Sequence, residues 1–100
     1  MKQTLAAQAF KLRVLSPSEV LFDDRAVSVS AKNKVGSFDV LAGHANFFSL
    51  ITKCELKIDT GVKSQVIPVS QGLIKVSDNT VTVYVNIRNE SENSDEKAIA

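Results

Sequence analysis

Short runs of strictly alternating apolar and polar residues are the feature of this sequence that most constrains its fold. Phe10, Leu12 and Val14 fall on one side of such a run, and the same period of two recurs over 53–59 and 80–87. A period of two is that of a β-strand with one buried and one solvated face. The sequence therefore predicts a series of half-buried strands, with no convincing long helix among them.

Turn-forming sequences separate these runs at intervals of about 8 to 12 residues, which is typical of β-sandwiches and barrels. The expected turns, marked by proline, glycine or adjacent Asp and Asn residues, are 16–19, 23–24, 32–34, 59–61 and 77–79. The expected strands and shorter extended pieces are 10–14, 20–22, 26–31, 35–41, 53–59, 63–69, 71–76 and 80–87. We therefore expect an all-β fold, a two-layer antiparallel β-sandwich of about eight to ten short strands.

The stretch LAGHANFFSLI, residues 41–51, contains the only histidine of the chain and reads as a tight turn between apolar anchors. Gly43 permits a left-handed backbone, and His44 and Asn46 are polar residues that suit a turn. The phenylalanines and aliphatic residues that follow bring the chain back to the core.

The domain organisation follows from where the alternation begins and ends. Residues 1–9 form a weakly patterned leader that we expect to be frayed, and residues 10–89 form the β-sandwich domain. Residues 90–100 are either a polar tail or the first turn of a helix with Ser94 as its N-cap. If they begin a helix, the natural protein continues beyond them.

Charge and sequence motifs argue against several classes of function. With 12 Lys and Arg against 11 Asp and Glu, the formal net charge is +1, so no overall field draws in nucleic acid or anionic lipid. The start of the chain lacks the apolar run of a signal peptide, and no segment has the about 20 apolar residues of a membrane span. We expect no nucleic-acid partner.

Catalytic and ligand-binding groups are also scarce. The single cysteine, Cys54, alternates with Leu56 and Ile58 on the expected core face, where a thiol acts as a small hydrophobe. His44 is a lone histidine in a polar turn, without other ligands at a metal-binding spacing. No phosphate-binding glycine loop is present. We expect no catalytic residue, metal, cofactor or small-molecule substrate.

A binding scaffold is the class of function that remains. Leu73 lies on the strand face opposite Ile74 and Val76, and Phe38 follows Gly36 and Ser37. Each apolar side chain is either an exposed contact for a partner or part of the core.

Four segments, in order and at matching spacing, resemble one known family. They are FKLRVLSP with the following LF (10–17 and 21–22), LAGHA (41–45), VSQGLIKV (69–76) and TVTV (80–83). They are similar to the opening strand, the LPGHA turn, the VSGGFLEV strand and the closing strand of the epsilon subunit of rotary F-type ATP synthases. The likeness covers roughly residues 10–88 and concerns the N-terminal β-sandwich domain of that subunit.

The resemblance implies a ten-stranded sandwich that docks on the gamma subunit of the central shaft and on the polar loops of the membrane-embedded c-ring. The chain would then be a non-catalytic rotor subunit of a proton- or sodium-translocating complex, peripheral to the cytoplasmic face of a bacterial inner membrane or its organellar equivalent. Family members continue into a C-terminal helical hairpin that can restrain ATP hydrolysis. The candidate partner-binding residues are Gly36, Ser37, Phe38, Gly43, His44 and Leu73.

Two departures from the family pattern bear on these expectations. Ala42 stands where proline is usual, and the loop 32–39, KNKVGSFD, is more basic than the Glu- and Gly-containing family loop that faces the ring. An alternative function, from a different class, is a free-standing β-sandwich or barrel module that binds nucleic acid or another ligand.

Overall fold

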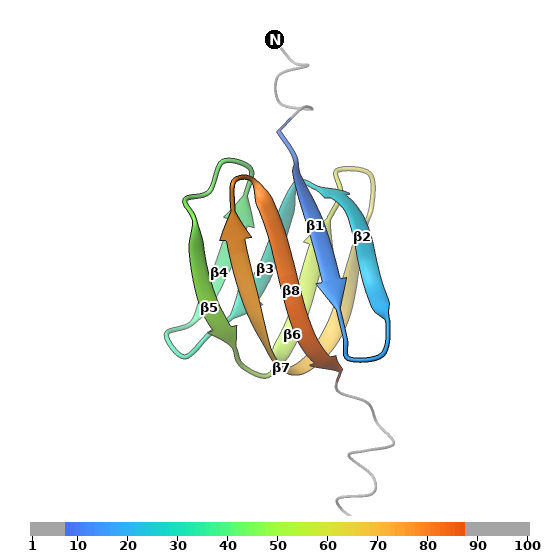
Figure 1. Cartoon of the computed structure of the whole chain (residues 1–100), viewed down its shortest axis with the longest axis vertical. Helices are drawn as coiled ribbons and strands as arrows, with labels where there is room; N and C mark the ends of the chain where they lie inside the picture. Colours follow the sequence, from blue (N-terminus) through green and yellow to red (C-terminus); the bar gives the residue numbers. More distant parts are fainter. Residues whose placement is uncertain (1–7, 88–100) are drawn as a thin grey trace, which may run out of the picture.

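The alternating runs form eight β-strands in the computed structural model, which describes residues 8–87 (Figure 1). The expected helix start or tail at 90–100, and all but the last two residues of the expected leader, lie outside that range. The strands are β1 (Phe10–Leu15), β2 (Val20–Ala26), β3 (Ser28–Lys32), β4 (Ser37–Leu41), β5 (Phe47–Ile51), β6 (Cys54–Asp59), β7 (Ser64–Ser77) and β8 (Thr80–Ile87).

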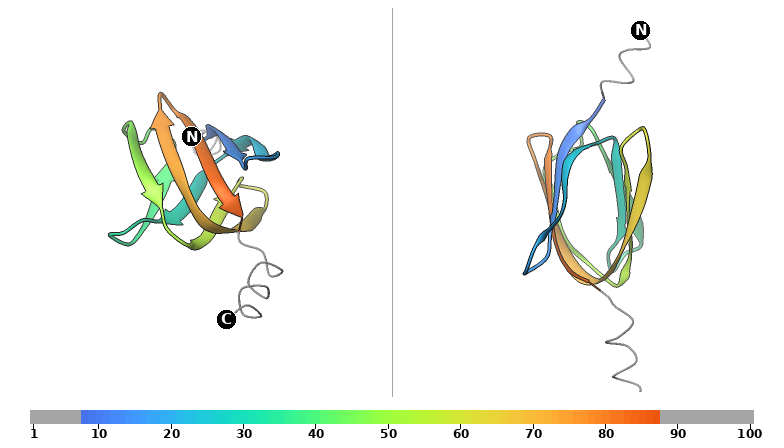
Figure 2. Two further views of the ribbon diagram at one scale, coloured as in Figure 1. Left: turned by 60° about the horizontal axis from the view of Figure 1, so that its bottom comes forward. Right: turned by 90° about the vertical axis from the view of Figure 1, so that its right-hand side faces the viewer.

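One long strand joins the two layers of the sandwich. The strand order is β2-β1-β8-β7-β6-β3-β4, with β5 paired to β7. The first part of the 14-residue β7 pairs with β6, and its second part lies between β5 and β8. In the right-hand view of Figure 2, β7 curves round the lower end of the molecule from one layer to the other. We call these the β6 layer (β7-β6-β3-β4) and the β8 layer (β5-β7-β8-β1-β2).

The core lies between the layers and consists of the apolar side chains that alternate along each strand with exposed ones. Among the described residues no polar or charged side chain is buried. Cys54 is buried and carries a free thiol on the core face of β6, as predicted. The buried side chains are Phe10, Leu12, Val14, Ala26, Val29, Ala31, Val40, Ile51, Cys54, Leu56, Ile58, Ile67, Val69, Ile74, Val76, Val81, Val83 and Val85. The β-sandwich prediction is therefore confirmed.

One strand pair departs from the expected antiparallel pattern. β1 and β8 are parallel, with Lys11 opposite Thr80 and Leu15 opposite Tyr84. Parallel neighbours need a long connection, because a tight turn reverses the direction of the chain. The connection here is almost the whole domain, so this pairing has no local signature in the sequence.

The turn predicted at Asp23-Asp24 is wrong, because both residues lie within β2. β2 is the outermost strand of the β8 layer, and it pairs on one side with β1. Both carboxylates are exposed. Charged residues on an edge strand prevent association with other edges, so adjacent aspartates are compatible with a strand there.

The two strands predicted at 63–69 and 71–76 are one strand with a β-bulge. The pairing to β8 shifts between Val69, opposite Ile87, and Gln71, opposite Asn86. The intervening Ser70 donates a hydrogen bond from Oγ to the carbonyl of Asn86, at 3.1 Å. A bulge bends the strand that carries it, which allows β7 to serve both layers.

Within residues 8–87 the structure has no helix of the length and hydrophobicity that crossing a membrane requires.

Gly72 follows the bulge, and the chain packs against it too closely for a side chain. A Cβ atom there would lie 2.5 Å from the carbonyl oxygen of Tyr84. We therefore expect Gly72→Ala to lower the free energy of unfolding by about 2–3 kcal/mol, because the β7–β8 pairing must shift to admit the methyl group.

Urea denaturation measures this effect. The control is Gln71→Ala on the same strand, where the side chain is exposed and the change should stay within about 0.5 kcal/mol. If Gly72→Ala is as stable as its control, the close packing described here is wrong.

Candidate protein-binding surfaces

The loop between β3 and β4 is a closed four-residue turn, residues 33–36, so the bend predicted at 32–34 is shifted by one to two residues and the segment likened to the family loop, 32–39, is only half loop. Ser37, Phe38 and Asp39 already belong to β4. The backbones of Asn33 and Gly36 exchange hydrogen bonds of 2.9 and 3.1 Å, and the Asn33 side chain accepts one from Val35 N at 2.9 Å. Gly36 has φ +148° with open space around it, so its backbone rather than crowding favours glycine.

This loop presents an apolar tip that follows two basic residues, Lys32 and Lys34. The Val35 side chain is 94% exposed, and Lys34 precedes it. Asn33 Nδ2 donates to Ser49 Oγ of β5 at 3.2 Å, which ties the loop to the β8 layer. The loop is thus a fixed protrusion at one end of the sandwich.

The turn at 42–46 lies at the opposite end of β4, as predicted from the sequence. Gly43 has φ +78°, in the left-handed region that glycine tolerates. His44 N donates to the Leu41 carbonyl at 3.2 Å, and the imidazole Nδ1 lies 2.7 Å from the Ala45 carbonyl. His44 is exposed.

Phe47 brings together two of the candidate residues that the sequence keeps apart. Its ring meets Phe38 edge-on, with centroids 5.8 Å apart, and lies 4.9 Å from the His44 ring. Phe38 and Phe47 are half-buried and pack against the core. The structure therefore places Phe38 at the edge of the core, and it links β4 to β5 across the side of the sandwich.

Leu73 occupies a different place, on the outer face of the β8 layer. It is paired with Leu50 of β5 on one side and Tyr84 of β8 on the other, and Tyr84 is paired with Leu15 of β1. Residues paired across a sheet point to the same face, so these four side chains form one continuous row. We call Leu15, Tyr84, Leu73 and Leu50 the apolar row.

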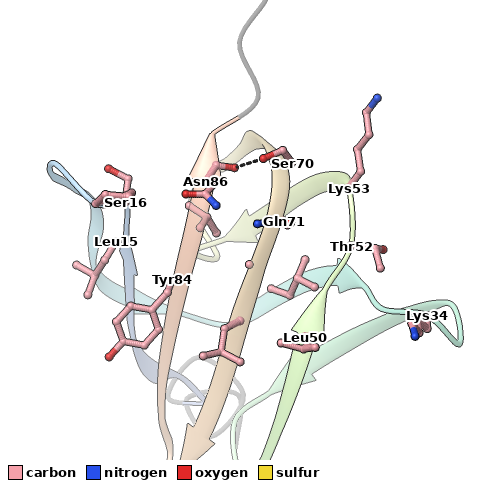
Figure 3. Close-up of a pocket in the computed structure, with 15 residues that line it drawn as sticks. Leu15, Ser16, Lys34, Leu50, Thr52, Lys53, Ser70, Gln71, Tyr84 and Asn86 are labelled. Atoms are coloured by element: carbon pink, nitrogen blue, oxygen red, sulfur yellow. Dashed lines mark hydrogen bonds between the residues drawn. The ribbon is translucent and has the colours of Figure 1, made fainter. Parts of the chain in front are cut away.

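The apolar row is accessible to solvent and forms part of a shallow groove. Leu50 is 67% exposed and Tyr84 48% exposed, and Phe48 beside Leu50 is 64% exposed. The groove has a volume of about 810 Å³. Figure 3 shows Leu15 and Tyr84 on one side of it and Leu50 on the other, with Lys34 and Lys53 beyond Leu50.

The outer face of the β6 layer is different in character. Lys57, Ser30 and Asp39 are paired in one row across β6, β3 and β4. The Ser30 hydroxyl donates to Asp39 Oδ1 at 2.6 Å. This polar row suits contact with water, whereas the apolar row suits contact with a protein.

Residues 8–87 bring no group of three His, Cys, Asp or Glu side chains into an arrangement that could hold a metal ion. Arg13 Nε lies 3.7 Å from Asp23 Oδ2 in an ion pair between β1 and β2, with both side chains nearly half exposed. An exposed pair of this length contributes little to stability.

The candidate residues thus fall into four places: Gly36 and Ser37 at the end of the β3–β4 loop, Phe38 at the edge of the core, Gly43 and His44 in the turn at 42–46, and Leu73 on the outer face of the β8 layer. Leu15, Leu50 and Tyr84 were missed. The sequence does carry a sign of them. Each is an apolar residue next to a residue that enters the core, so the alternation of the strand places it on the outer face. Tyr84, for example, lies between the buried Val83 and Val85.

The comparisons with known proteins agree with this architecture. Residues 9–89 match the family described as ATP synthase, Delta/Epsilon chain, beta-sandwich domain. The chain belongs to this family. The epsilon-subunit resemblance noted in the sequence is therefore confirmed.

Curated relatives support the assignment. The ATP synthase epsilon chain of Ruminococcus albus is 37% identical over 78 residues, which are 77% of this chain and 58% of the relative. That of Clostridium perfringens is 38% identical over 88 residues, 87% of this chain and 66% of the relative. The chain thus spans about three-fifths to two-thirds of the length of these family members.

Solved structures share the fold. A chain in the cryo-EM structure of the Tetrahymena thermophila mitochondrial ATP synthase central stalk and c-ring superposes with a TM-score of 0.70 and 16% identity, over 82% of this chain and 67% of that one. A chain of the Euglena gracilis mitochondrial ATP synthase gives 0.73 and 18%, over 89% and 61%.

The position of the apolar row can be tested on the isolated protein. Leu50 is exposed and its neighbour Ile51 is buried. We expect Leu50→Thr to change the free energy of unfolding by less than about 0.5 kcal/mol, because threonine keeps the strand propensity of an exposed position.

Ile51→Thr is the matched control, and it should cost about 2–3 kcal/mol because it leaves a cavity and buries a hydroxyl. Urea denaturation of both variants gives the comparison. Equal losses of stability would mean that the apolar row is part of the core.

Proposed function

We propose that this chain is a non-catalytic rotor subunit of an F-type ATP synthase, in which it couples the gamma subunit to the c-ring. Family membership and relatives named as ATP synthase epsilon chains support the assignment. In this function the protein is peripheral to the cytoplasmic face of a membrane through the complex that it joins. It needs two contact surfaces on a stiff domain and no active site of its own.

The observation that carries the proposal is the apolar row on one outer face only. Association buries apolar surface that would otherwise face water, and large aromatic and aliphatic side chains dominate the energetics of protein interfaces. Tyr84, Leu73 and Leu50 are the anchors that the gamma subunit would cover. Leu15, paired with Tyr84, lengthens this contact toward the edge of the layer.

A second surface is required for the ring, and the β3–β4 loop is our candidate. It stands at one end of the sandwich, and its closed turn fixes Val35 and Lys34 in a defined position. Gly36 and Ser37 are exposed beside them. A fixed protrusion can transmit a lateral force to a partner, whereas a flexible loop would yield.

Calorimetric titration with the gamma subunit of the same organism tests the first contact. We expect binding near one-to-one, and we expect Leu50→Asp to weaken it by at least about tenfold, since it places a charge in an apolar interface.

The matched control is Val66→Asp. Val66 is also an exposed aliphatic residue, but it pairs with Lys57 on the outer face of the β6 layer, so binding should change less than about twofold. A folded wild-type chain that does not bind gamma would contradict the proposed function. Equal effects of both changes would contradict the choice of face.

The loop is tested separately by charge reversal. If the loop faces the ring, Lys34→Glu should slow association with purified c-ring in complex with gamma by about two- to fivefold at low salt, and less at high salt, because it changes long-range attraction between the surfaces.

Lys57→Glu makes the same change of charge on the outer face of the β6 layer, and its association rate should match that of the wild type. Surface plasmon resonance on immobilised gamma–ring complex measures both rates. Identical rates for the two variants would remove the loop from the ring contact.

A further inference from the structure

The turn between β7 and β8 contains two residues, Asp78 and Asn79, whose types are those that a two-residue β-hairpin turn favours. Asp78 and Asn79 have φ values of +50° and +61°, and Ser77 is paired with Thr80 across them. This is the two-residue hairpin geometry in which Asn, Asp and Gly are all favoured. Turn formation alone therefore does not require an asparagine at position 79.

The side-chain amide of Asn79 bonds to two other parts of the chain. Its Oδ1 accepts a hydrogen bond from Gly43 N at 2.8 Å, and its Nδ2 donates to the carbonyl of Ala9 at 3.0 Å. These partners are 36 and 70 residues away in the sequence. Among the residues that favour this turn, only an amide both donates and accepts, because aspartate lacks the donor and glycine lacks both groups.

The turn at 42–46 has few other restraints. Gly43 has no atom within 4 Å of the position of a Cβ, so no neighbouring group is packed against that side of its backbone. Besides the Asn79 bond, one other side chain ties the turn to the β7–β8 turn: Asn46 Oδ1 accepts from Asp78 N at 2.9 Å. The remaining contacts are local: His44 N donates to Leu41, the His44 ring meets Ala45 and Phe47, and Ala42 packs against the core. In Figure 1 the β7–β8 turn lies beside this loop, at the end of the domain where β1 begins.

We propose that Asn79 is a positioning residue, which holds the Gly43–His44 turn in the conformation that the gamma subunit recognises. This inference rests on the proposed function, and it adds that part of the gamma contact lies at this end of the domain. A turn that is already ordered loses less conformational entropy on binding than a mobile one. Through Phe47, the position of His44 is also linked to that of Phe38.

The test compares two glycine variants of the same turn. Asn79→Gly and Asp78→Gly both replace a residue at positive φ with glycine, which tolerates that conformation. Only the first removes the bonds to Gly43 and Ala9, because Asp78 contributes its backbone and not its side chain to the network. Affinity for gamma is measured by calorimetry with the full chain at a temperature where every variant is folded.

We expect Asn79→Gly to weaken gamma binding by about five- to tenfold and Asp78→Gly by less than about twofold. Amide hydrogen exchange on the free chain should show faster exchange at Gly43 in the first variant alone. A purely stabilising role would lower the melting temperature without changing the affinity of folded molecules, so equal affinities of the two variants would overturn the proposal.

A third variant keeps the proposal testable if Asn79→Gly does not fold. Asn79→Asp retains the acceptor for Gly43 N and loses the donor to Ala9, so it should bind gamma within about twofold of Asp78→Gly. A markedly weaker affinity would overturn the assignment to the Gly43 bond. If the wild-type chain itself does not bind gamma, the proposed function fails, which is a distinct result.

Discussion

The continuity of β7 is the constraint on which the rest of the structure depends. A sandwich needs two sheets, and every buried backbone amide and carbonyl needs a partner. Here a single 14-residue strand supplies both sheets with partners, first β6 and then β5 and β8. The bulge at Ser70, and the lack of a side chain at Gly72, allow the strand to bend where the layers meet.

This arrangement gives the molecule two unlike outer faces. Because both layers share β7, its outward residues change from one face to the other along the strand: Val66 belongs to the β6 layer and Leu73 to the β8 layer. The β6 layer carries the polar row, and the β8 layer carries the apolar row. A domain that binds a partner on one side and meets water on the other needs this asymmetry.

Much of this fold can be read from the alternation of residues, and the failures have physical causes. Asp23-Asp24 has the composition of a turn, but an edge strand accepts charge on both faces, even at Asp24, which is paired with the buried Leu12. The alternation alone predicts a break between strands at position 70, because a bulge and a turn both interrupt the period of two. The apolar row depends on register between four strands, and the bonds of Asn79 join distant segments, so neither follows from local pattern.

The parallel pairing of β1 with β8 has a mechanical consequence. The chain enters the domain at one end, at Phe10, and leaves β8 at the other, at Ile87, with the two strands side by side and running in the same direction. Tension between these two points loads the paired positions from Lys11–Thr80 to Leu15–Tyr84 together, in shear, because the strands are pulled along their length in opposite directions. The hydrogen bonds of a parallel pair are evenly spaced, so they share this load and must break nearly simultaneously. The domain therefore resists a force that pulls its two ends apart.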